Sequence, residues 1–153
     1  MRSAPLNYLL TLGLAGVLWI VFSFVLGNYL ADNVSLLQAT IEEFVGTYRT
    51  AITAAAIVGV LITFVWYFLG SKPEAAKDMR KASRLWTTLL LTAFAAAVVT
   101  TIALVVLFGG EQFTLLQYVV FFLAASALTW LLYWISTVVW SPRAVMNTMP
   151  PRK

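Results

Sequence analysis

The chain has 153 residues, of which 61% are hydrophobic and 10% charged, and its formal net charge is +4. Soluble domains are about 45–50% apolar and about 25% charged, so this composition excludes an ordinary soluble domain and indicates a membrane protein. The sequence contains no cysteine and no histidine, which excludes disulfides, thiolate metal sites, CxxC redox chemistry and histidine-ligated haem.

Four uncharged apolar segments are each long enough to cross a bilayer, which takes about 20 residues. Backbone groups in lipid must be satisfied within the segment, and β-barrel alternation is missing, so each segment is predicted to be a helix. The first is longer than the apolar core of a signal peptide, about 7–15 residues, and we expect a retained anchor. The predicted fold class is an all-α membrane protein, a four-transmembrane-helix bundle that forms one domain over residues 1–153. The spans are expected at about residues 8–29, 50–69, 85–108 and 113–140.

The loop after the first span is predicted to contain an amphipathic helix that merges with the second span. Asp32 or Asn33 is available as its N-cap, and apolar residues follow at helical intervals. Glu42 and Glu43 are candidates for a cation-attracting mouth or a partner contact; alternatively, they are solvated acids on an interfacial helix. Arg49 is expected to snorkel to the interface. The apolar positions are Val34, Leu37, Ile41, Phe44, Val45 and Tyr48.

The loop after the second span, SKPEAAKDMRKASR at residues 71–84, concentrates charge between two apolar segments. Ser71 and Glu74 have the spacing of a capping box, which predicts a short amphipathic helix leading into the third span. Its basic side chains either anchor the loop at anionic headgroups or form a docking face for a cytoplasmic partner. These candidates are Lys77, Arg80, Lys81 and Arg84.

The basic residues also predict orientation. Nine of the ten lie in the N-terminus, the second loop and the tail at 141–153, and Arg49 is the exception. The positive-inside rule then places both termini in the cytoplasm, with a bacterial inner membrane as the expected location. The net positive charge is therefore a topology signal, and no nucleic-acid partner is expected.

Small residues recur at helix-packing intervals within the spans, which lets membrane helices approach closely. They serve either this bundle or contact with another subunit, which includes a second copy of the chain. Leu89 is expected to face lipid, and aromatic clusters at 64–68 and 130–140 are expected to form interfacial belts. The predicted packing residues are Ala55, Gly59, Ala93, Ala97 and Thr101, with Ala125 and Thr129 on the fourth span.

No ionisable residue falls within the four predicted spans. Proton relays, coupled transporters and voltage sensors place such groups there, so these classes are disfavoured. Because the spans also lack paired carboxylates and any base that could activate a hydroxyl, we expect neither an enzyme nor a bound cofactor.

Two function classes remain open. The first is a non-enzymatic structural or assembly subunit of a larger inner-membrane complex, such as a secretion, conjugation, motility or respiratory machine, whose partners are the lipid bilayer and other membrane subunits. The alternative is a small channel or carrier for a small or amphipathic solute, with hydroxyls along its path. The candidate hydroxyls are those of Thr63, Thr100, Thr101 and Ser126.

Overall fold

The computed structural model describes residues 4–33, 40–71, 79–108 and 113–140. These ranges are helical and contain no strand, and four of the helical stretches are long and apolar enough to cross a membrane. The prediction of an all-helical chain with four long apolar helices is confirmed. The helices are α1 (Ala4–Ile20), α2 (Gly27–Asn33), α3 (Ile41–Gly70), α5 (Met79–Phe108) and α6 (Leu115–Trp140), with a π-helical turn at Val21–Leu26 joining α1 to α2.

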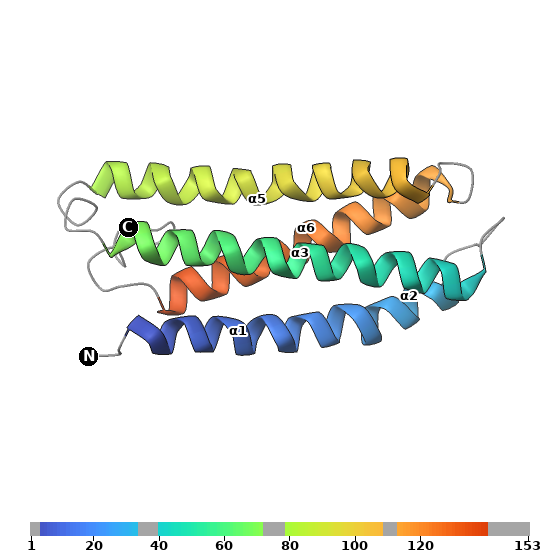
Figure 1. Cartoon of the computed structure of the whole chain (residues 1–153), viewed down its shortest axis with the longest axis horizontal. Helices are drawn as coiled ribbons and strands as arrows, with labels where there is room; N and C mark the ends of the chain where they lie inside the picture. Colours follow the sequence, from blue (N-terminus) through green and yellow to red (C-terminus); the bar gives the residue numbers. More distant parts are fainter. Residues whose placement is uncertain (1–3, 34–39, 72–78, 109–112, 141–153) are drawn as a thin grey trace.

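The helices lie side by side, with α3 between α1 and α5, and α6 crossing the group obliquely (Figure 1). As a result α6 packs against all of α1, α3 and α5. The first residues of α1 and α5 and the last residues of α3 and α6 share one end of the bundle, where Asn7 Nδ2 donates to the Trp140 carbonyl at 2.7 Å. We call this the Asn7 end, and the opposite end, where α3 begins, the Thr40 end.

Helix α3 begins at a capping box. The Glu43 N–H donates to Thr40 Oγ1 at 3.2 Å, and the Thr40 N–H donates to Glu43 Oε2 at 2.9 Å, so two helix-end donors are satisfied reciprocally. The predicted N-cap at Asp32 or Asn33 is wrong, because both residues are the last of α2. The helix starts well before the predicted span, and residues 41–48 are its first two turns; residues 34–39 lie outside the described ranges.

The first span is not one regular helix. The Gly27 N–H donates to the Phe22 carbonyl, five residues back, and this bond marks the π turn. The Tyr48 hydroxyl of α3 donates to the same carbonyl at 3.0 Å. A Cβ on Gly27 would lie 3.0 Å from Tyr48 Cε1, so the tyrosine ring occupies the space that a larger residue at position 27 would need.

Two apolar clusters form the interior. The cluster toward the Thr40 end contains the rings of Phe44, Tyr48, Phe113, Tyr118 and Phe121, with neighbouring centroids 5.3–6.3 Å apart. The cluster toward the Asn7 end contains Trp66, Tyr67, Trp86 and Tyr133. Helix α6 contributes to both.

The predicted aromatic belts are only partly exposed on the surface of the bundle. Trp66 and Tyr133 are 0% exposed, whereas Trp130 is 38% exposed and stacks on Trp134. The expectation of an exposed belt is therefore wrong for the buried rings, which pack against other helices of the chain.

Candidate functional site

The predicted packing residues of α3 and α5 lie inside the bundle. Ala93 and Ala97 are 1% and 4% exposed, and Ala55 and Gly59 are also buried. A Cβ on Gly59 would stand 2.9 Å from Leu132 Cδ2 of α6, a distance that real Cβ contacts essentially never show. These four residues line the contacts of α3, α5 and α6 within the chain.

We call these contacts of α3, α5 and α6 the packing seam. Threonine hydroxyls beside it bond to backbone carbonyls. Thr129 Oγ1 of α6 donates to the Ala125 carbonyl at 2.9 Å and approaches the Ala55 carbonyl of α3 at 3.3 Å. Thr101 is half-buried, and its hydroxyl donates to the Ala97 carbonyl at 2.9 Å. The seam thus combines close backbone approach with a contact from a hydroxyl to the neighbouring helix.

The opposite face of α5 carries a second set of small residues. Thr88, Thr92 and Ala95 are exposed and follow one another at intervals of four and three residues, so they share one side of the helix. We call these three residues the outer stripe of α5. The Thr92 hydroxyl donates to the Thr88 carbonyl at 2.9 Å. The sequence alone did not single out this side of α5, and only the fold reveals that it points away from the bundle.

Leu89 does not face outward. It is half-buried and packs against the cluster that contains Trp86, Ala93 and Tyr133. The expectation that Leu89 contacts lipid is wrong, because it lies on the inward side of α5, four residues before Ala93.

Polar side chains tie the helices together near the Asn7 end. Thr11 Oγ1 and the Tyr67 hydroxyl lie 2.9 Å apart, the Tyr67 hydroxyl donates to the Ser136 carbonyl at 3.1 Å, and Thr11 Oγ1 reaches the Asn7 carbonyl at 2.9 Å. The two hydroxyls carry two hydrogens for these three contacts, so the hydrogens can be shared in more than one way. This network joins α1, α3 and α6.

A second pair of bonds joins α5 to α6. Trp86 Nε1 donates to Thr137 Oγ1 at 2.9 Å, and the Tyr133 hydroxyl donates to the Trp86 carbonyl at 3.1 Å. Both are buried, so each satisfies groups that would be costly to leave unpaired in an apolar interior.

The hydroxyls expected along a solute path are mostly engaged by their own helices. Thr63 donates to the Gly59 carbonyl at 2.7 Å, and Thr100 donates to the Ala96 carbonyl at 2.8 Å. Ser126 Oγ is buried and has no hydrogen-bond partner among the described residues. With the Thr101 hydroxyl, three of the four candidate hydroxyls are thus bonded within their own helices.

The charged candidates are exposed and lie at opposite ends of the bundle. Glu42 and Glu43 are in the first turn of α3 at the Thr40 end, whereas Arg80, Lys81 and Arg84 are in the first two turns of α5 at the Asn7 end. The acids suit the positive end of a helix dipole. Of the amphipathic helix predicted within residues 71–84, residues 79–84 form the first turns of α5. Residues 72–78, which include Lys77, and the tail at 141–153 lie outside the described ranges. The fold therefore keeps the two acids of α3 and the basic residues of α5 at separate ends of the bundle and does not bring them into one site.

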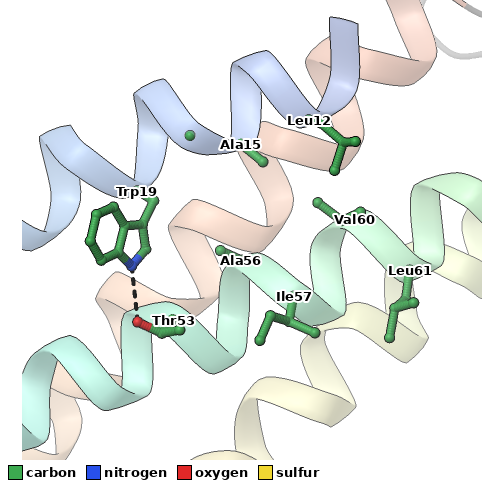
Figure 2. Close-up of a pocket in the computed structure, with 9 residues that line it drawn as sticks. Leu12, Ala15, Trp19, Thr53, Ala56, Ile57, Val60 and Leu61 are labelled. Atoms are coloured by element: carbon green, nitrogen blue, oxygen red, sulfur yellow. Dashed lines mark hydrogen bonds between the residues drawn. The ribbon is translucent and has the colours of Figure 1, made fainter. Parts of the chain in front are cut away.

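An apolar groove opens between α1 and α3 (Figure 2). Its volume is about 360 Å³. The indole Nε1 of Trp19 donates to Thr53 Oγ1 at 2.9 Å, and Thr53 Oγ1 donates to the Arg49 carbonyl at 2.8 Å, so the polar atoms at this end are already satisfied. The lining residues are Leu12, Ala15, Gly16 and Trp19 of α1 and Thr53, Ala56, Ile57, Val60 and Leu61 of α3.

Sequence reasoning missed this groove. Its only signal was the pair Gly13 and Gly16 on an otherwise bulky first span. At both glycines an added Cβ would meet nothing within 4 Å, so neither glycine is there to admit a neighbouring helix of this chain.

Within the described residues no three His, Cys, Asp or Glu side chains gather to hold a metal ion. Comparison with protein-family models, with curated proteins and with solved structures gives no match for this chain.

Proposed function

We propose that the chain is a non-enzymatic structural or assembly subunit of a larger protein complex in a bacterial inner membrane, such as a secretion, conjugation, motility or respiratory machine. The observation that carries this proposal is the outer stripe of α5. Small side chains let membrane helices pack closely, and Thr88, Thr92 and Ala95 point away from the helices of their own chain. A transmembrane helix of another subunit is the partner that fits such a surface.

The orientation we propose is both termini cytoplasmic. Nine of the ten basic residues come before α1, between the end of α3 and the second turn of α5, or after α6 in the sequence. The helix ends next to these segments share the Asn7 end, so the positive-inside rule favours that end as cytoplasmic. The stripe then starts one turn beyond Arg84, in the cytoplasmic half of α5, where a partner's helix could contact the stripe and the basic turns together.

The interior supports a structural role. Its polar groups hold helices to one another, as in the contacts of Tyr67 with Thr11 and Ser136. The hydroxyls on which the channel or carrier alternative depends, among them Thr63 and Thr100, bond to their own helices, so we give that alternative second place.

Added bulk on the stripe tests the proposal. In Ala95→Leu the partner helix would be pushed away, and we expect co-purification of the partner to fall about tenfold or more, because overpacking costs on the order of 1–3 kcal/mol and 1.4 kcal/mol is tenfold in binding. Abundance and thermal stability of the chain itself should not change. The measurement is affinity purification from native membranes in mild detergent, with subunits quantified by mass spectrometry.

Gly13→Leu is the control, since it also introduces a leucine side chain, at an exposed position of α1 with open space around it. Co-purification of the same subunits at wild-type levels with Ala95→Leu would contradict a partner contact at the stripe. If only further copies of the chain are recovered, the proposal of a larger complex is wrong and the chain forms a homo-oligomer.

A further inference from the structure

The groove between α1 and α3 lies at the depth of the acyl chains of one leaflet. The sequence carries no charge between Arg49 and Lys72, and a helix of that length matches a hydrocarbon core about 30 Å thick at about 1.5 Å per residue. Arg49 is thereby placed at the boundary with the headgroups. The groove follows α3 from Thr53 to Leu61, about 12 Å by helix rise, which reaches from just inside that boundary to near the midplane.

The groove suits an apolar occupant. The Trp19 and Thr53 polar atoms bond to each other and to backbone, so a guest finds hydrocarbon surface and no free donor or acceptor in the lining. The volume of about 360 Å³ falls within the roughly 300–1,000 Å³ of ligand sites. Gly16 keeps the groove open, because a side chain there would project into empty space.

A cation stands directly above the groove. The Arg49 guanidinium carbon lies 4.5 Å from the centroid of the Phe24 ring, and that ring meets the Trp19 indole edge to face at 5.8 Å. A continuous row of contacts therefore leads from the groove to the guanidinium. Arg49 is half-buried, and its Nε is covered and has no hydrogen-bond partner among the described residues. A planar guanidinium at headgroup depth is suited to bind phosphate.

We infer that the groove holds one acyl chain of a phospholipid whose phosphate is bound by Arg49, in the leaflet at the Thr40 end. The apolar groove lies at the depth of a lipid's acyl chain, and Arg49 lies at the depth of its phosphate. A partner helix would fit this arrangement only if it placed an acidic side chain beside Arg49. This site is on α1 and α3, so it is independent of the stripe on α5.

Photocross-linking tests the site. The purified chain is placed in phosphatidylcholine vesicles that contain a small fraction of phosphatidylglycerol with a diazirine in one acyl chain, and adducts are mapped by mass spectrometry. We expect adducts concentrated at residues 12–19 and 53–61. Gly16→Leu should lower the yield of these adducts about tenfold or more, because the added side chain fills the groove and excludes the acyl chain. Gly13→Leu, with the same bulk outside the groove, should leave them unchanged.

Arg49→Gln distinguishes binding of the lipid phosphate from binding of the acyl chain. The variant should lower adducts from the phospholipid several-fold, since a charge-assisted bond is lost, but not those from an uncharged diazirine fatty alcohol in the same vesicles. Thermal melts of the two variants check that both remain folded. The inference is overturned by adducts spread evenly over exposed faces such as Leu91–Ile102 of α5, by an unchanged pattern in Gly16→Leu, or by an Arg49→Gln effect that is absent or equal for both probes.

Discussion

Two alanines of α5 that are separated by a single residue have opposite surroundings. Each residue of an α-helix turns by about 100°, so side chains two apart point to nearly opposite sides. Ala97 is 4% exposed and belongs to the interior cluster, whereas Ala95 is exposed. The same substitution, alanine to leucine, therefore tests folding at Ala97 and association with a partner at Ala95.

Ala97→Leu should destabilise the chain itself. The added side chain must separate α5 from the helices packed on it, at a cost on the order of 1–3 kcal/mol. The measurement is the free energy of unfolding in detergent or bicelles. The sequence left open whether Ala97 serves this bundle or another subunit, and its buried position assigns the expected damage to the fold.

Ala95→Leu serves as the control for that measurement and should leave the free energy of unfolding within about 0.5 kcal/mol of wild type, as surface substitutions do. Equal stability of the two variants would remove Ala97 from the packing seam.

At the scale of the element, the π turn is where the first span departs from a regular helix. Single π turns interrupt α-helices and are frequent at functional sites. Here the Phe22 carbonyl receives both the Gly27 N–H and the Tyr48 hydroxyl. One side chain of α3 thus fixes the irregular turn, and the absence of a side chain at Gly27 admits the ring.

Tyr48→Phe should loosen this turn. The ring stays in place while the hydrogen bond to Phe22 is lost, at a cost of about 0.5–1.5 kcal/mol. Hydrogen–deuterium exchange of residues 21–33 should accelerate relative to the rest of the chain. The Tyr118 hydroxyl is buried with no hydrogen-bond partner among the described residues, so Tyr118→Phe should be neutral or stabilising. Indistinguishable exchange in the two variants would argue against a role for the Tyr48 bond.

The sequence was sufficient to predict the helices but not their inward faces. Length and hydropathy require four long helices in a bilayer, and these are present. An apolar side chain suits lipid and a helix interior equally, so nothing local separates buried Trp66 from exposed Trp130, or inward Leu89 from outward Leu91. The cap at Thr40 and the π turn escaped prediction because several residues in the region could serve as caps and because the turn depends on a contact from another helix.

At the scale of the whole molecule, labelling can test the orientation, because the chain has no cysteine and one introduced thiol is a unique target. Asn33 and Ser71 are exposed at opposite ends of the bundle. In intact cells a membrane-impermeant maleimide should label Asn33→Cys, and Ser71→Cys only after the inner membrane is permeabilised, since the positive-inside rule puts position 71 in the cytoplasm. The reverse pattern would invert the proposed topology.

The candidate sites required the assembled bundle. The basic residues of α5 and the acids of α3 can be read from the sequence, but the groove needs the relative placement of α1 and α3. The row Trp19, Phe24 and Arg49 also joins residues of two helices. Gly16 can be read from the sequence as a small residue, but its place in the lining of the groove follows only from the position of α3 relative to α1.

The oblique path of α6 has a consequence for the synthesis of the protein. It is the last of the four long helices to be translated and the most buried of them, and it receives bonds from each earlier one: from Asn7, from Tyr67 and from Trp86. Until α6 arrives, those donors lie in the bilayer without these acceptors, which is costly in hydrocarbon. We therefore expect the nascent three-helix chain to be less stable in the membrane than the complete bundle, and the final helix to complete the fold.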